Sequence, residues 1–302
     1  MMQIRSYLLA GAALFALSAC GTVDHEAAWE SSGAREARAE AHEGERETLL
    51  RKAEQAWAER DDAEKTLEAI RAYRDAVEID PNDVDTLVKL AHAEYYYADC
   101  HLSFDEEDEE AYKQMLQSST KSAEYALMAL SSEFANRMRN GWRIEEAVTV
   151  LDKTAVPALY WRSSALGKWA TAEGFATLLS YKDEVKAIME RCLELDRTFY
   201  YYGPDRYFGV FYGRAPAMSG GDLNKSRQHF NLSLEKEPNY FATRVLMADD
   251  YAVKAQDKAL YRELLEAVIH GDPESLPEAA PENRCEQRKA KILLEQIEDR
   301  FE

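Results

Sequence analysis

The residue types that most often carry catalysis form no catalytic pattern in this chain. The six histidines are never spaced four apart, and the sequence lacks H-E-x-x-H. The glycine-rich stretch at 213–221 lacks the G-K-S/T ending of a phosphate-binding loop, and no G-x-S-x-G nucleophile motif occurs. The acidic run at 105–110 lacks the glycine and the final glutamate of a calcium loop. We therefore expect no enzyme activity, no cofactor and no metal site.

Two stretches concentrate tyrosine and tryptophan, which suit binding rather than catalysis. Residues 158–170 hold Trp161 and Trp169, whose spacing of eight places them on one helix face. Residues 199–212 surround Arg206, which could meet an anionic ligand group. We expect most of these aromatic residues to form core between helix hairpins and a few to line a ligand or partner site. The candidates for that lining are Trp161, Trp169, Tyr202, Arg206 and Tyr212.

Cys20 is the residue with the clearest chemical role. Arg5 supplies a short positive region, and residues 7–16 are apolar but shorter than the roughly 20 residues that span a bilayer. Residues 17–20, Leu-Ser-Ala-Cys, resemble the lipobox of bacterial lipoproteins, in which the thiol takes a diacylglyceryl group. We expect cleavage before Cys20 and a lipid on its thiol. The alternative is an ordinary signal peptide with a chance cysteine. By resemblance to enterobacterial sorting, the glycine at position 21 favours the outer membrane.

The composition and the number of cysteines limit the kinds of partner and the compartment that we expect for this protein. The 302 residues carry a net charge of -19, which repels phosphate backbones, so we expect no nucleic-acid partner. Beyond Cys20, three cysteines remain: Cys100, Cys192 and Cys285. Their odd number and the lack of C-x-x-C favour buried free thiols, with one disulfide as the alternative in an oxidising periplasm.

The elements that position these residues are predicted to be helices. Residues 20–44 are rich in Ala, Glu and Arg and are typical of a tether. From about residue 45 the apolar residues recur with helical spacing, and no run alternates like a strand. We therefore divide the chain into a signal peptide (1–19), a lipidated tether (20–44) and a single α-helical domain (45–302).

Local signals predict where several of these helices begin. Ser103 opens a capping box followed by acidic residues, and Asp222 follows two glycines as an N-cap. Pro157 and Pro281 are typical of a first helical turn. The last helix is predicted to run from Pro281 through Phe301.

Two segments repeat a spacing of 0, +4, +7 and +12. They are Ala69, Tyr73, Ala76, Pro81 and Ser226, Phe230, Ser233, Pro238. The pattern resembles the second helix of a tetratricopeptide repeat, in which small residues let two helices approach and proline ends the helix. A weaker copy at 185–197 has Arg197 in place of the proline. The two prolines are 157 residues apart, which is not a multiple of the roughly 34-residue period, so we predict an irregular all-α tetratricopeptide-like array of stacked antiparallel hairpins.

The motifs of the central region carry a family resemblance. They are Leu159-Tyr160-Trp161 with Gly167-Lys168-Trp169-Ala170, residues 190–196, Tyr202-Gly203-Pro204-Asp205-Arg206 with Gly209, Pro216, Gly220-Gly221-Asp222, Ala248 and residues 283–294. The chain resembles the T-component (TatT) family of lipoproteins associated with tripartite ATP-independent periplasmic (TRAP) transporters. The resemblance implies a periplasmic helical-repeat lipoprotein, a homo-oligomer with a pore-like cavity, and a TRAP-type solute-binding protein as partner.

These observations define a leading hypothesis and alternatives. The leading one is a membrane-anchored accessory protein that docks a periplasmic solute-binding protein and passes a small hydrophobic or organic-acid ligand. The first alternative is a structural adaptor lipoprotein in envelope or outer-membrane-protein assembly. The second is a periplasmic hydrolase, for which the sequence offers no catalytic constellation.

Overall fold

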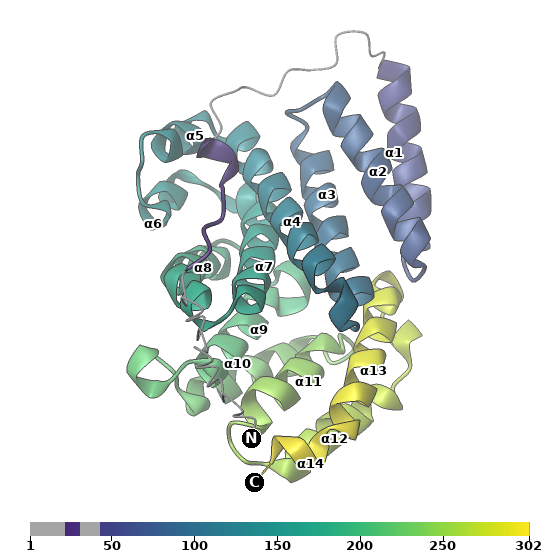
Figure 1. Cartoon of the computed structure of the whole chain (residues 1–302), viewed down its shortest axis with the longest axis vertical. Coiled ribbons are helices and arrows are strands. Elements are labelled where there is room, and N and C mark those ends of the chain that lie inside the picture. The colour runs from purple at the N-terminus through teal and green to yellow at the C-terminus, as the bar shows by residue number, and fades with distance from the viewer. Residues whose placement is uncertain (1–21, 31–42, 302) are drawn as a thin grey trace, which may run out of the picture.

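A computed structural model describes residues 22–30 and 43–301, and over this part of the chain it is helical without a strand (Figure 1). The predicted signal peptide (1–19) and Cys20 lie outside the described residues. The predicted all-α helical repeat array is confirmed, because neighbouring helices pack as pairs: α1 with α2, α3 with α4, α7 with α8, and α9 with α10.

The first half of the array contains the helices up to α7. Their bounds are α1 (Glu43–Ala58), α2 (Ala63–Ile79), α3 (Val84–Tyr97), α4 (Glu109–Leu130), α5 (Ser132–Arg139), α6 (Ile144–Ala147) and α7 (Val156–Glu173). A π-helical turn, η2 (Ala98–Leu102), extends α3. Such turns are rare and frequently mark functional positions.

The second half continues from α8. Its helices are α8 (Phe175–Leu195), α9 (Phe199–Arg214), α10 (Leu223–Lys236), α11 (Ala242–Leu246), α12 (Lys258–Ile269), α13 (Ala280–Glu295) and α14 (Ile297–Arg300). A second π-helical turn, η7 (Met247–Ala252), extends α11. The two π-helical turns therefore extend helices in different halves of the array.

The two sets of repeated residues occupy equivalent positions in the core. On α2 and α10 the small and aromatic residues of the pattern are buried. They are Ala69, Tyr73, Ala76, Ser226, Phe230 and Ser233. A buried small residue lets the paired helix approach, which is the packing that the shared spacing predicts.

Most of the predicted helix starts are confirmed. The Asp222 side chain accepts hydrogen bonds from the backbone N–H groups of Asn224 and Lys225, and Pro157 lies in the first turn of α7. The prediction at Ser103 is wrong, because Asp105 caps a short 3-10 turn and α4 begins only at Glu109. The last helix begins as predicted, with Pro281 in the first turn of α13, but it breaks at residue 296 and continues as α14.

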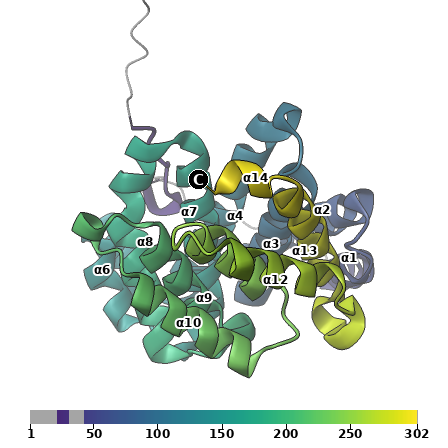
Figure 2. The same cartoon turned by 90° about the horizontal axis from the view of Figure 1, so that it is seen from below.

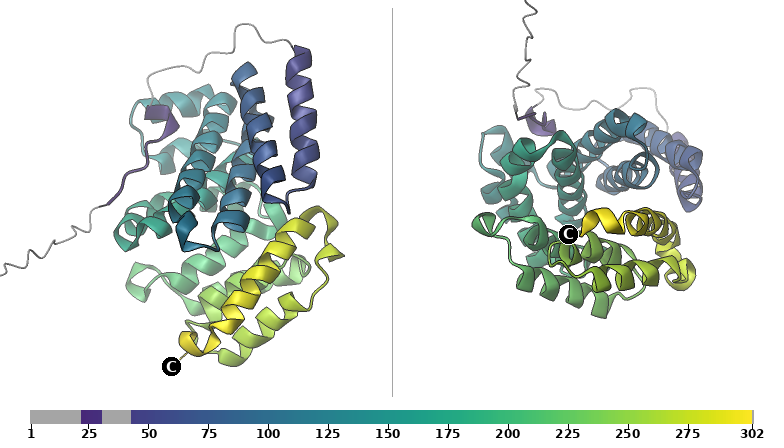
Figure 3. Two further views of the ribbon diagram at one scale, coloured as in Figure 1. Left: turned by 45° about the vertical axis from the view of Figure 1, so that its right-hand side comes forward. Right: turned by 60° about the horizontal axis from the view of Figure 1, so that its bottom comes forward.

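The C-terminal end of the array returns to its N-terminal half. Figures 1 and 3 show α13 beside the ends of α1 and α2, and Figure 2 shows the same closure from below. Arg60, after α1, donates to both carboxylate oxygens of Glu282 on α13 at 3.0 and 2.8 Å. A disulfide joins Cys100 on η2 to Cys285 on α13. We call these four residues the closing seam.

This disulfide corrects the expectation of three buried free thiols. The sequence separation of 185 residues hides the pairing from local spacing, whereas the fold brings the two Cα atoms to 5.6 Å. Cys192 is free and buried, as expected.

Residues 22–30 differ from the predicted tether. They lie against α4, α5, α7 and α8, and Ala27, Ala28 and Trp29 are buried. The Trp29 ring packs edge-on against Phe134 on α5 at 5.9 Å. We call residues 22–30 the N-terminal strap. None of the described helices is long and apolar enough to cross a bilayer.

Candidate functional site

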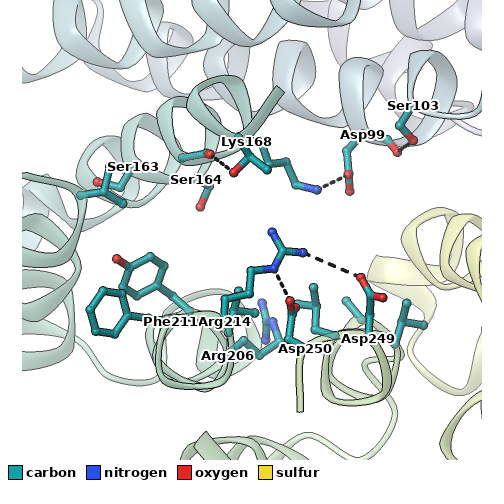
Figure 4. Close-up of a pocket in the computed structure, with 18 of the residues that line it drawn as sticks. Asp99, Ser103, Ser163, Ser164, Lys168, Arg206, Phe211, Arg214, Asp249 and Asp250 are labelled. Atoms are coloured by element: carbon teal, nitrogen blue, oxygen red, sulfur yellow. Dashed lines mark hydrogen bonds and ion pairs between the residues drawn. The ribbon is translucent and has the colours of Figure 1, made fainter. Parts of the chain in front are cut away.

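A cavity of about 810 Å³ lies between the two halves of the array. The upper wall comes from α3, η2 and α7 and the lower wall from α9 and η7 (Figure 4), and α13 also contributes to the lining. Both π-helical turns contribute acidic residues to the lining, Asp99 from η2 and Asp249 and Asp250 from η7. A volume of this size is within the range of small-molecule sites.

One part of the lining, which we call the aromatic end, consists of rings. Its members are His92, Tyr160, Trp161, Tyr200 and Tyr240. His92 stacks on Trp161 with ring centroids 3.9 Å apart, and Tyr200 meets Trp161 edge-on at 4.7 Å. Burial lowers the pKa of His92 to about 3, so its ring is neutral at physiological pH. The aromatic end therefore offers flat, uncharged surfaces.

Arg206 on α9 borders the aromatic end. Its guanidinium donates to the backbone carbonyls of Tyr201 and, at 2.7 Å, of Tyr200. It also donates to the Tyr160 hydroxyl at 3.4 Å and lies over the Tyr240 ring at 4.4 Å. The Arg206 side chain is thus fixed by carbonyl oxygens and rings.

The carbonyls that hold Arg206 come from an unusual backbone segment. Tyr200, Tyr201 and Tyr202 have φ values of 46°, 57° and 57°, so all three are left-handed. This conformation costs a residue with a side chain roughly 1–2 kcal/mol. Hydrogen bonds to a charged group contribute about 1.5–3 kcal/mol each, so the two carbonyl bonds to Arg206 offset much of that cost.

Gly203 follows this segment and lets α9 approach α7. A Cβ atom at this position would lie 2.5 Å from the ring of Tyr160, which is too close for any side chain. Pro204 comes next, in the first right-handed turn, where its missing N–H removes no helical hydrogen bond.

A group of ion pairs lies on the upper side of the cavity. Lys168 and Lys289 each donate to Asp99 at 2.7 Å, and Lys289 also pairs with Glu286 at 2.8 Å. Burial would raise the pKa of Asp99, but the two lysines outweigh burial and hold that pKa well below its usual range. Asp99 is therefore a carboxylate at physiological pH.

The lower side carries a second group of ion pairs. Figure 4 shows Lys168 and Arg214 reaching into the cavity from opposite walls. Arg214 pairs with Asp250 and, at 3.8 Å, with Asp249, which Arg300 also contacts at 2.8 Å. Burial raises the pKa of Asp250 to about 6 although Arg214 acts against it, and Oδ2 of this carboxyl has no hydrogen-bond partner within the described part of the chain.

The five residues singled out from the sequence divide between the cavity and the core. Trp161 and Arg206 line the cavity, 3% and 4% exposed. Trp169 does not, and it packs against His25 of the strap and Tyr181 of α8. Eight residues at 100° each leave Trp169 about 80° from Trp161 around the helix, which turns it from the cavity to the strap.

The other two candidates also lie outside the lining. Tyr212 stacks on His229 of α10 with centroids 5.7 Å apart, and the ammonium group of Lys225 lies over the Tyr212 ring, 5.2 Å from its centroid. Tyr202, half-buried in the left-handed segment, does not reach the cavity. Both expectations came from the local density of aromatic residues, which does not report the direction of a side chain.

Several lining residues were not singled out from the sequence. Lys168 was within reach of pattern reasoning, because Tyr160, Ser164 and Lys168 recur every fourth residue and share one helix face. His92 and Asp99, on α3 and η2, are distant in sequence from Trp161 and Tyr240. Only the closed arrangement of the array brings them to the same cavity.

An all-α repeat array closed around a cavity defines a class of helical-repeat protein with an internal surface that can hold a ligand. Within that class, residues 69–301 match the model of the TRAP transporter T-component family, so the chain belongs to this family. Membership makes it an accessory component of TRAP transporters, as the resemblance implied. The search of curated proteins gave no match.

Proposed function

We propose that this protein is a lipid-anchored accessory component, facing the periplasm, that docks the solute-binding protein of a TRAP transporter and receives a small organic ligand. The observation that carries the proposal is the cavity of about 810 Å³ at the centre of a T-component array. An array that served only as a scaffold would need a surface but no internal cavity lined by rings and charges.

The anchor is part of the proposal. The strap begins two residues after Cys20 and is held to α8, since Thr177 and Tyr181 accept hydrogen bonds from the backbone N–H groups of Val23 and His25. A lipid on Cys20 would therefore hold the body close to the membrane, and we propose the outer membrane. The Cys100–Cys285 disulfide supports an oxidising compartment such as the periplasm.

The anchor is tested with Cys20→Ser, compared with Cys192→Ala, which leaves the N-terminus unchanged. The native chain and the control should incorporate labelled fatty acid and fractionate with membranes, and Cys20→Ser should do neither. Equal labelling of all three would exclude lipidation at Cys20.

Docking is tested by capture of the tagged, full-length chain from detergent-solubilised membranes after mild cross-linking. Enrichment of a TRAP solute-binding protein or membrane subunit is the expected result. Enrichment of outer-membrane-protein assembly factors instead would favour the structural adaptor. The mass of the captured complex also reports whether the chain forms the homo-oligomer that the family resemblance implies.

A further inference from the structure

Arg206 differs from the other charged residues that line the cavity. Each lining acid has a basic partner: Asp99 with Lys168 and Lys289, Asp249 with Arg300, Asp250 with Arg214, Glu282 with Arg60, and Glu286 with Lys289. Arg206 has no carboxylate partner within the described part of the chain. Glu282 lines the same cavity, but both of its oxygens accept from Arg60.

The neighbours of Arg206 are neutral. Burial raises the pKa of Tyr200 and Tyr240 well above the usual range, so neither ring supplies a negative charge. The guanidinium has five N–H donors and stays protonated in proteins. Two carbonyls and one hydroxyl engage three of these donors, and two remain for another acceptor.

A buried cation without a counter-ion is costly, because the low dielectric of the interior does not replace its hydration. A carboxylate that entered the cavity would remove this cost and form charge-assisted hydrogen bonds.

The surroundings of Arg206 limit the rest of the ligand. Trp161, Tyr200 and Tyr240 line the same end of the cavity, where Tyr200 packs edge-on against the other two rings at 4.7 and 5.7 Å. A second carboxylate would find only cations that already have partners, and would have to break an existing ion pair. One negative charge and a flat apolar body therefore fit this site.

We propose that the aromatic end binds an aromatic monocarboxylic acid, with its carboxylate on Arg206 and its ring among the aromatic side chains of that end. This inference rests on the proposed role of the cavity as a ligand site, and it adds the chemical class of the ligand.

The test is calorimetry on the purified, full-length chain with phenylacetate, its neutral isostere phenylacetamide, and succinate. We expect phenylacetate to bind at least tenfold more tightly than either of the others. Equal binding of acid and amide would overturn the proposal, because Arg206 would then not select a charge. Tighter binding of succinate, or no binding of any of the three, would overturn it as well.

Arg206→Gln removes the charge but keeps an amide donor for the tyrosine carbonyls. It should weaken phenylacetate binding about 10- to 100-fold, the range expected for lost charge-assisted hydrogen bonds, and leave phenylacetamide unchanged. Arg244→Gln is the matched control, since Arg244 also donates to a backbone carbonyl, that of Pro238, but lies outside the cavity lining. Equal affinities for the native chain and Arg206→Gln would contradict the assignment.

The comparison of acid with amide needs no variant, so it remains decisive if Arg206→Gln does not fold. It also needs no partner protein. Selective acid binding without capture of a TRAP component would contradict the docking function and leave the ligand assignment standing. Capture of a TRAP component without selective acid binding would contradict the ligand assignment and leave the docking function standing.

Discussion

At the scale of single residues, Gly203 sets how closely α9 approaches α7. Gly203→Ala should cost about 1–3 kcal/mol of stability, because its Cβ would lie 2.5 Å from the Tyr160 ring and displace a partner of Arg206. Urea unfolding followed by circular dichroism measures the change. Gly44→Ala is the control, since a Cβ there meets nothing within 4 Å, and alanine favours a helix by up to about 1 kcal/mol. Equal stability of the two variants would show that the approach is not tight.

Asp250 and Asp99 should impose opposite dependences of stability on pH. The pKa of Asp250 is raised to about 6 in the folded chain, so the folded state holds this proton after the unfolded state has lost it. Stability from this group is therefore lost as pH rises from about 4 to 6, by on the order of 3 kcal/mol. The pKa of Asp99 is lowered instead, so its contribution is present at neutral pH and is lost on acidification.

Thermal unfolding between about pH 2 and 8 measures both effects. Asp250→Asn should gain stability relative to the native chain as pH rises through 4–6, whereas Asp99→Asn should lose stability relative to the native chain as pH rises towards about 4 and should show no further change above it. If the melting temperatures of both variants changed with pH in the same way as that of the native chain, the assignment of the two carboxyl groups would be contradicted.

At the scale of elements, the N-terminal strap depends on a buried network around Glu124 of α4. This carboxylate accepts from the Ala28 backbone N–H at 2.7 Å and from Arg162 at 3.0 Å, and it contacts Nε2 of His25 at 3.1 Å. All three partners are buried, so solvent screens these interactions little. The strap therefore belongs to the folded body.

Glu124→Gln should release the strap. Removal of one partner from a buried ion pair costs about 3–5 kcal/mol, because it leaves Arg162 with less compensation. Hydrogen exchange should show faster exchange in residues 22–30 and the adjoining part of α8. Lys121→Gln is the control, since Lys121 pairs with Glu26, whose side chain is 75% exposed, and such a pair is worth at most about 1 kcal/mol. Unchanged exchange in Glu124→Gln would contradict the network.

The elements also show what local sequence can predict. The repeated positions around Tyr73 and Phe230 and the cap at Asp222 depend on neighbours within one helix or hairpin, and these predictions were confirmed. The left-handed Tyr200–Tyr202 segment was not foreseen, because tyrosine has no preference for this conformation. It depends on Arg206 and on the packing of α9. The strap was missed because its short sequence has few large apolar residues.

At the scale of the whole molecule, the closing seam turns a row of helix pairs into a closed array around the cavity. Arg60, Glu282 and the Cys100–Cys285 disulfide join segments more than 180 residues apart. The candidate site depends on this closure, because Asp99 and Lys289 face each other across the same seam. Residue spacing predicted the stacking of helices but could not predict this non-local join.

Cys285→Ser should therefore destabilise the whole array. A cross-link over a loop of this length contributes about 5 kcal/mol in the chain-entropy model. The melting temperature should fall, and proteolysis should cleave near η2 and α13. Reduction of the native chain or of Cys192→Ala, which keeps the disulfide, should reproduce the effect, and Cys285→Ser should not respond to reductant. A melting temperature insensitive to reductant would contradict the role of the seam.

The central claim, that the cavity is the working site of a TRAP accessory protein, is tested most directly by photo-cross-linking at its mouth. Phe175 lines the cavity and is 71% exposed, whereas Trp142 is 46% exposed and lies outside the lining. Benzoylphenylalanine replaces each in turn in living cells. We predict that ultraviolet light joins position 175, but not position 142, to a TRAP solute-binding protein or membrane subunit. The same adducts at both positions, or only envelope-assembly proteins at position 175, would contradict the claim.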